Sequence, residues 1–171
     1  MRAGSALTLI RITFLLILGL LFLALVLPIV SWQLKPAGFL DAVIIDKTVP
    51  YSDYREHRGL MWILNHEKFF NAETGQPFDF RKDYYGFFPL AEGEYYTTEY
   101  KGGEERPDLI YLVDTYGVYE GDYSLDDLRG NPSERIYGGL EKEELAAIKN
   151  QLQDGTLIIG EFNTMASPTF F

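Results

Sequence analysis

The stretch Ala42-Val43-Ile44-Ile45-Asp46-Lys47-Thr48 decides the fold of this chain, because a run of apolar, mostly β-branched residues ends abruptly in polar ones. Continuous apolar runs of this length are typical of strands buried on both faces. Residues 109–113 and 156–160 form two further runs of the same kind, and residues 84–88 predict a fourth, shorter strand. The chain therefore contains the strands of a small, mostly parallel sheet.

Helical patterns separate the predicted strands. Residues 53–68 and 141–153 carry apolar side chains at helical spacing, and Asp53 with Glu56 fits a capping box at the start of the first helix. Strands that alternate with helices indicate βαβ units. We therefore predict an α/β domain, a mostly parallel sheet flanked by helices in a Rossmann-like or flavodoxin-like arrangement. The segments 89–107 and 119–137 are predicted to be loops.

An apolar segment precedes this domain. Residues 12–32 contain no charged residue, and about 20 apolar residues in a helix span a hydrocarbon core of roughly 30 Å. The segment is longer than the apolar core of a signal peptide and lacks a small-x-small cleavage site. We therefore predict an uncleaved transmembrane helix in the lipid bilayer and keep a cleaved signal peptide and a buried core helix as alternatives.

The charges flanking the apolar segment predict its orientation. Arg2 and Arg11 precede it, whereas only Lys35 follows it closely, and basic residues stay on the cytoplasmic side. The expected organisation is a cytoplasmic terminus at 1–11, a transmembrane helix at 12–32, a linker at 33–38 and an extracytoplasmic domain at 39–171. This arrangement predicts a single-pass membrane protein, and the absence of cysteine from the chain is compatible with the bacterial cell envelope.

The charge and the composition exclude several classes of function. All 25 acidic residues but only 13 of the 15 basic ones follow the apolar segment, so the domain has a formal charge of −12 and should not bind nucleic acid. The chain has no cysteine, which removes disulfides and thiolate nucleophiles. It also lacks the Gly-x-Ser-x-Gly turn, the His-Glu-x-x-His zinc motif and phosphate-binding loops.

Polar side chains follow three of the predicted strands, and ligands bind beyond the carboxyl ends of the strands in an open parallel sheet. We expect a ligand site there, or else ordinary polar loop beginnings. Its side chains are those of Asp46, Lys47, Thr48, Asp114, Thr115, Glu161 and Asn163.

Two kinds of chemistry suit this set of side chains. The carboxylates of Asp46, Asp114 and Glu161 are oxygen ligands suited to Mg²⁺ or Ca²⁺, although no cofactor is required by any motif. His57 and Glu56, early in the first helix, are the candidate catalytic residues for acid–base chemistry.

The second half of the domain resembles the class I glutamine amidotransferase-like fold. The resemblance covers roughly residues 108–163 and rests on a strand ending in Asp114-Thr115-Tyr116-Gly117, on Tyr137-Gly138-Gly139-Leu140, on a helix, and on a final strand ending at Gly160. In that family the turn after this strand carries a nucleophilic cysteine. Here that turn is Gly160-Glu161-Phe162-Asn163. The resemblance therefore implies the fold but not glutaminase activity.

The whole chain also resembles bacterial membrane proteins that combine an anchor with such a domain, a likeness that implies no activity. The sequence ends at Phe171, soon after a core strand. This predicts either a piece of a longer membrane protein or a minimal form of the fold.

Three functions remain open at this stage. The first is a non-enzymatic envelope domain that binds a ligand or a protein or saccharide partner. The second is a metal-assisted hydrolase or transferase acting on an envelope saccharide or peptide. The third is a structural subunit of a membrane complex.

Overall fold

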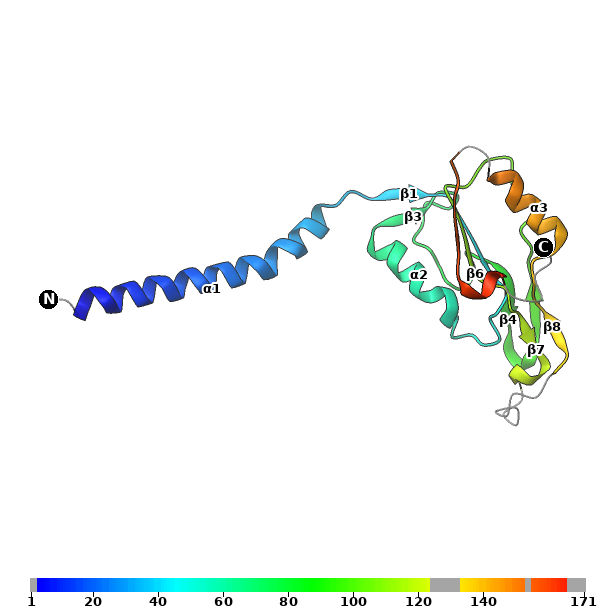
Figure 1. Ribbon diagram of the computed structural model, residues 1–171, viewed down its shortest axis with the longest axis horizontal. Coiled ribbons are helices and arrows are strands. Elements are labelled where there is room, and N and C mark those ends of the chain that lie inside the picture. Colours follow the sequence, from blue (N-terminus) through cyan, green and yellow to red (C-terminus); the bar gives the residue numbers. More distant parts are fainter. Residues whose placement is uncertain (1–2, 124–132, 153–154, 166–171) are drawn as a thin grey trace. The chain divides into compact units, whose positions relative to one another are not determined.

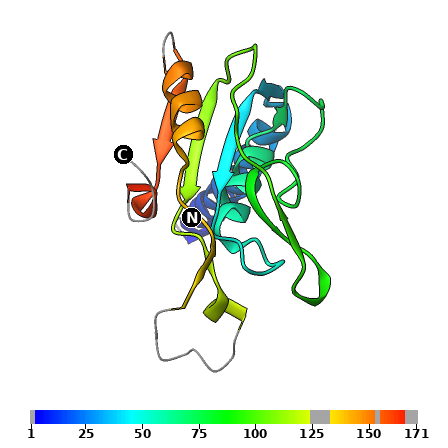
Figure 2. The same cartoon turned by 90° about the vertical axis from the view of Figure 1, so that its right-hand side faces the viewer.

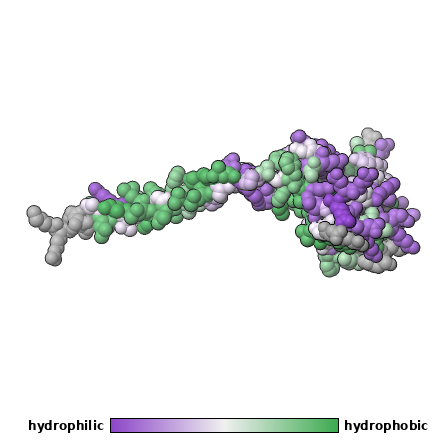
Figure 3. All heavy atoms as spheres, turned by 90° about the horizontal axis from the view of Figure 1, so that it is seen from above, coloured by the Kyte–Doolittle hydropathy of each residue, from purple (hydrophilic) through white to green (hydrophobic). Residues whose placement is uncertain are grey.

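The computed structural model describes residues 3–123, 133–152 and 155–165, and the chain divides into two compact units, 1–36 and 37–171. The first unit is the helix α1 (Ala3–Leu34), drawn in blue in Figure 1. Its residues Leu7–Leu34 are long and apolar enough to cross a membrane, and none of this segment is buried. Its surface is largely hydrophobic in Figure 3. A signal sequence near the amino terminus passes the same test.

The second unit is a mixed α/β domain built on a five-stranded sheet with the strand order β5-β4-β2-β6-β9. Strands β4, β2, β6 and β9 are parallel, and β5 is an antiparallel strand at one edge. The five strands are β2 (Ala42–Asp46), β4 (Tyr85–Pro89), β5 (Tyr95–Thr97), β6 (Leu109–Asp114) and β9 (Leu157–Gly160).

Helices α2 (Arg55–His66) and α3 (Lys142–Gln151) lie on opposite faces of this sheet, as Figures 1 and 2 show. The alternation of side chains along β2 explains the two layers. Ile44 packs into one apolar cluster with Met61 of α2, and Val43 packs into the other with Ile148 of α3. The central strand is thus buried on both faces, as its unbroken apolar sequence predicts.

Short elements complete the domain. Two small sheets consist of the parallel pair β1 (Gly38–Leu40) and β3 (Phe69–Asn71) and of the antiparallel pair β7 (Val118–Tyr119) and β8 (Arg135–Tyr137). The three 3-10 helices are η1 (Ala91–Gly93), η2 (Glu120–Tyr123) and η3 (Phe162–Met165).

The predicted strands and helices are present, with two corrections. The capping box at Asp53 and Glu56 is wrong. Helix α2 begins after Tyr54, which has a left-handed backbone (φ 50°) and no side-chain cap, whereas the box forms at α3 between Glu141 and Glu144. The segments predicted as loops contain strands β5, β7 and β8, and residues 124–132 of the second segment lie outside the described residues.

Gly86 permits the close approach of β4 to β2. Its φ is +143°, and a Cβ built on it lies 1.7 Å from the carbonyl oxygen of Asp46. A side chain at this position would therefore overlap the backbone of the central strand.

We expect Gly86→Ala to lower the free energy of unfolding by about 3 kcal/mol or more, because it combines backbone strain with a steric overlap. Gly75→Ala is the matched control, since Gly75 also has a positive φ (+66°) but its Cβ would meet nothing within 4 Å. The control should cost only about 1–2 kcal/mol. Urea unfolding of the full chain in non-ionic detergent measures both, and equal losses would contradict the overlap.

Candidate functional site

The carboxyl ends of β2 and β6 are joined by a hydrogen-bond network centred on Asp114. Its Oδ1 accepts from the hydroxyl of Thr48 (2.8 Å) and from the backbone N–H of Tyr116 (2.7 Å), and its Oδ2 accepts from the Asn163 side-chain amide (2.8 Å). The Thr48 hydroxyl in turn accepts from the backbone N–H of Gly117 at 2.8 Å. Three of the predicted site residues therefore come together, but they satisfy one another.

Asp46, at the end of β2, and His57, in the first half of α2, form a second, fully buried group. The Nδ1 of His57 lies 2.7 Å from Oδ2 of Asp46, and both side chains have no exposed surface. The second ring nitrogen, Nε2, lies 2.7 Å from the backbone carbonyl oxygen of Phe80. The other carboxylate oxygen of Asp46 accepts from the backbone N–H of Thr48 at 3.0 Å.

The geometry of His57 requires a proton to be shared with Asp46. A carbonyl oxygen only accepts, so Nε2 must carry the hydrogen that it donates to Phe80. Nδ1 faces a carboxylate oxygen, so one more proton lies between these two atoms. Burial raises the pKa of Asp46, and the hydrogen bond and charge of His57 oppose that rise. The pair is therefore a closed unit in which neither group is free to serve as an exposed base.

Lys47 points to the opposite face of the sheet, where it pairs with Glu144 of α3. Its Nζ donates to Glu144, and both side chains are 1% exposed. The ammonium also lies 4.9 Å from the centre of the Tyr137 ring, an arrangement that stabilises a cation. Glu144 further accepts from the backbone N–H of Tyr100 at 3.3 Å. The buried ammonium therefore has a carboxylate and an aromatic ring beside it, and the buried carboxylate has an ammonium and a backbone N–H.

The remaining predicted residues do not join these groups. Thr115 is buried, and its hydroxyl donates to the backbone carbonyl of Thr164 at 3.2 Å. Glu161 is exposed and accepts from the Tyr111 hydroxyl at 2.9 Å. Burial, followed by the hydrogen bond to this carboxylate, raises the pKa of Tyr111 to about 12. Both residues are thus committed to local contacts.

The carboxylates predicted to hold a cation have different partners. Asp46 faces His57, Asp114 faces Thr48 and Asn163, and Glu161 faces Tyr111. Within the described part of the chain, no three His, Cys, Asp or Glu side chains gather into a group suited to a metal ion. Glu56, a candidate catalytic residue, bonds the neighbouring Arg55 at 3.1 Å.

Sequence reasoning missed Glu144 and Tyr137, which complete the environment of Lys47. The alternation of side chains along a strand could have indicated this pairing. Val43, Ile45 and Lys47 are two residues apart from one another along the chain, so their side chains point to the same face of the sheet. This alternation places the lysine on the side of α3. Helix α3 carries a Glu in its first turn, and Glu144 accepts from the backbone N–H of Glu141 at 3.2 Å.

Comparisons with known proteins assign no family. No family model, no curated protein and no solved structure matches this chain. The resemblance to glutamine amidotransferase-like domains therefore stays a prediction.

We expect His57→Gln to lower the free energy of unfolding by about 3–5 kcal/mol at neutral pH, because it leaves the buried Asp46 carboxyl without the histidine that shares a proton with it. His66→Gln on the same helix is the control, since His66 is exposed; it should change stability by less than about 0.5 kcal/mol. Urea unfolding of the full chain in detergent measures both. If His57→Gln lowers the free energy of unfolding by no more than His66→Gln does, the buried His57–Asp46 pair does not contribute to stability.

The stability of the His57→Gln variant should itself depend on pH. Without His57, burial raises the pKa of Asp46 with less opposition. A carboxyl whose pKa is higher in the folded state binds protons on folding, so its contribution is favourable below the unfolded pKa and is lost as pH rises through the folded pKa. The free energy of unfolding of His57→Gln should therefore rise as pH falls from 8 to 5, relative to that of the double variant His57→Gln and Asp46→Asn, in which position 46 does not titrate. A difference between these two variants that is constant over this range would contradict the assignment.

Proposed function

We propose that this chain is a single-pass membrane protein of the bacterial cell envelope whose acidic α/β domain lies outside the cytoplasm and binds a ligand or a protein partner without catalysing a reaction. The apolar segment of α1 supports an anchor. The basic residues before it support a cytoplasmic amino terminus, and the lack of a small-x-small exit supports an uncleaved helix.

The observation that carries the non-enzymatic proposal is the saturation of the carboxyl end of the sheet. Asp114 accepts three hydrogen bonds, and both ring nitrogens of His57 lie 2.7 Å from oxygen acceptors. Lys47 is paired and buried. General acid–base chemistry needs a group within hydrogen-bond reach of a substrate, and these groups reach one another instead. Their arrangement therefore favours a structural role.

The strand order supports a flavodoxin-like arrangement. Numbered in chain order, the parallel strands β2, β4, β6 and β9 follow the order 2-1-3-4, which is the beginning of the flavodoxin-like order. The crossover from β4 to β6 contains the 3-10 helix η1 and strand β5. We propose a reduced flavodoxin-like domain, for which the point between β2 and β6 is the topological switch.

Two alternatives differ in what they require. A cation-assisted hydrolase needs His57 to leave its pair with Asp46 before it can act as a base. A structural subunit of a membrane complex has one specific observation in its favour. Strand β9 lies at the edge of the sheet, and the apolar side chains of Leu157, Phe162 and Met165 beside it are 57%, 94% and 69% exposed.

The chain contains no cysteine, so a single introduced cysteine reports its own location. We expect Thr74→Cys, on the exposed surface of the domain, to react with a membrane-impermeant maleimide in intact cells. Ser5→Cys should react only after the membrane is opened. Both products should keep the mass of the full chain. Labelling at position 5 alone in intact cells would overturn the proposed orientation. A product that has lost α1 would overturn the uncleaved anchor.

A second experiment separates the binding proposal from the cation-assisted enzyme. A cation that binds only the folded state at a hundredfold excess over its Kd raises the free energy of unfolding by about 2.7 kcal/mol. We expect Mg²⁺ and Ca²⁺ to leave the unfolding of the full chain unchanged relative to EDTA. Stabilisation by Mg²⁺ or Ca²⁺ that disappears in Asp114→Asn and persists in the exposed control Glu143→Gln would favour the cation-assisted enzyme over the binding domain.

A further inference from the structure

The amino-terminal half of β2 has a neighbouring strand on one side only. β6 pairs with all of β2, from Ala42 to Asp46, whereas β4 pairs with it only at Ile45 and Asp46 within the described residues. The sheet is therefore interrupted beside Ala42–Ile44. Ala42 and Val43 are lining residues of the cavities on that side, whereas Ile44 is fully buried.

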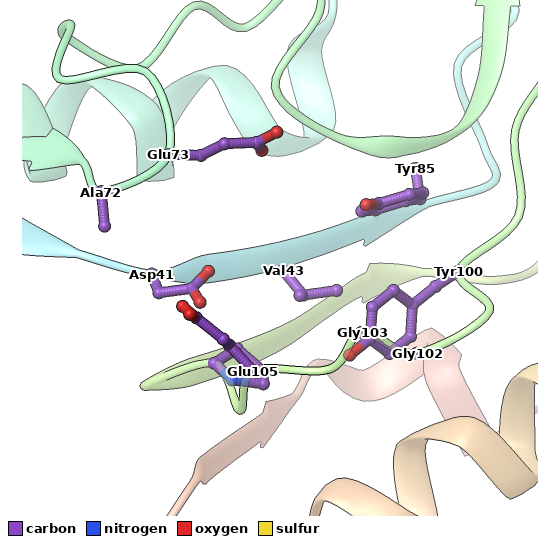
Figure 4. Close-up of a pocket in the computed structure, with 10 residues that line it drawn as sticks. Asp41, Val43, Ala72, Glu73, Tyr85, Tyr100, Gly102, Gly103 and Glu105 are labelled. Atoms are coloured by element: carbon purple, nitrogen blue, oxygen red, sulfur yellow. The ribbon is translucent and has the colours of Figure 1, made fainter.

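Two adjoining cavities fill the interruption, with volumes of about 300 and 340 Å³. They share four lining residues, Asp41, Val43, Glu73 and Tyr85, and we call the combined feature the β2 groove. In the close-up of the first cavity, the carboxylates of Asp41 and Glu105 point toward one another, and Glu73 lies across the cavity from them (Figure 4). The groove lies at the opposite end of β2 from the saturated network.

The electrostatics of the groove are unbalanced. The first cavity is lined by three carboxylates and by no lysine or arginine, while the second adds Lys82 and Asp83. Burial raises the pKa of Asp41, and so do the neighbouring carboxylates of Asp108, Glu105 and Glu73, whereas no basic group opposes them. A positive charge entering the groove would relieve this repulsion.

Aromatic rings provide the second wall of the groove. The rings of Tyr85 and Tyr100 stand edge to face, with centroids 5.4 Å apart and planes at 66°. Burial, followed by nearby acidic or phenolic groups, raises the pKa of both hydroxyls, so both rings stay neutral at ordinary pH. Neutral tyrosine faces attract cations. The groove thus offers both of the surfaces that recognise an organic cation, carboxylates and aromatic faces.

The spacing of the carboxylates favours an organic cation over a bare metal ion. Mg²⁺ and Ca²⁺ need several oxygen ligands at about 2.0–2.6 Å. Among the described residues, no three acidic or histidine side chains converge in that way. An ammonium group on an alkyl chain is larger, donates three hydrogen bonds in different directions and places its methylene groups against aromatic rings.

We propose that the β2 groove binds the ammonium group of an organic amine, held by Asp41, Glu73 and Glu105 and by the faces of Tyr85 and Tyr100. This site rests on the proposed binding function and gives it a ligand class. The same chemistry is carried by a small free amine and by the lysine side chain of an extended peptide, whose backbone would also lie beside Ala42 in the second cavity.

Isothermal titration calorimetry of the full chain in non-ionic detergent tests the proposal with n-butylammonium and 1,4-diaminobutane. We expect saturable binding of both, no binding of the uncharged analogue 1-butanol, and weaker binding at higher salt. Binding should also weaken as pH falls, since protonation of Asp41 removes the charge that the ammonium meets. Equal binding of 1-butanol, or no binding of either amine at millimolar concentration, would overturn the proposal.

Variants locate the site. Glu73 and Glu105 are exposed, so the double change Glu73→Gln and Glu105→Gln should leave the fold intact while weakening amine binding by about tenfold or more. Glu143→Gln removes one exposed carboxylate outside the groove and should leave the affinity unchanged. Tyr85→Leu should weaken binding more than Tyr85→Phe does, because Phe keeps an aromatic face. Equal losses in Glu143→Gln would assign the binding to net charge alone.

A capped Gly-Lys-Gly peptide and its form methylated on the lysine backbone nitrogen distinguish the two sources. A peptide that binds at least tenfold more tightly than n-butylammonium, and loses this gain on methylation, identifies an extended peptide. Equal affinities identify a small amine. The amine site and the membrane orientation are tested by different results. If cysteine labelling places the domain outside the cytoplasm but no amine binds, only the proposed amine site is overturned. If the amines bind but labelling places the domain in the cytoplasm, only the proposed orientation is overturned.

Discussion

The structure depends on two buried pairs of ionisable side chains, which consecutive residues of the central strand form on opposite faces of the sheet. Asp46 pairs with His57 of α2, and Lys47 pairs with Glu144 of α3, and all four side chains are at most 1% exposed. Removing such charges from water costs several kcal/mol per ion, a cost that only a well-positioned partner offsets. Each helix is therefore held at a defined position against the end of β2, because any other position would leave a charge buried without a partner. The apolar clusters on the two faces add stability that is less directional.

The same constraint changes the role of the carboxyl end of the sheet. In an open parallel sheet this end is where ligands usually bind, yet here its polar groups close on one another. Asp114 joins the ends of β2 and β6 through Thr48 and reaches Asn163 of η3. Gly117 and Gly138 allow the chain segments that follow to lie against each other, since a Cβ on Gly117 would fall 2.2 Å from the Tyr137 carbonyl oxygen. The network therefore holds together three segments of the chain, namely the end of β2, the end of β6 and the 3-10 helix η3.

The sequence was sufficient to predict the parallel strands, both domain helices and the gathering of polar residues at the strand ends, because continuous apolar runs and helical spacing are local signals. It was insufficient wherever tertiary contact decides. Asp53 has the composition of a helix cap, but the left-handed backbone of Tyr54 sets the start of α2. Strands of two or three residues such as β1, β5 and β7 exist only because a partner strand lies beside them. Of the polar residues expected at this edge, Thr48, Asp114 and Asn163 meet there. Lys47 lies on the other face of the sheet because of the parity of β2, where it pairs with Glu144, which no motif marks.

The two ends of β2 differ in electrostatic balance. At the carboxyl end each buried ionisable side chain has a partner: Lys47 pairs with Glu144, Asp46 with His57, and Asp114 accepts three hydrogen bonds. At the amino end Asp41 is flanked by carboxylates, and the pKa of its own carboxyl is raised. A fold that holds like charges together where the sheet is open has an unfavourable interaction that a cation relieves. The domain carries a formal charge of −12, so its field attracts cations from a distance. In the proposed site, that attraction is combined with the aromatic rings of Tyr85 and Tyr100.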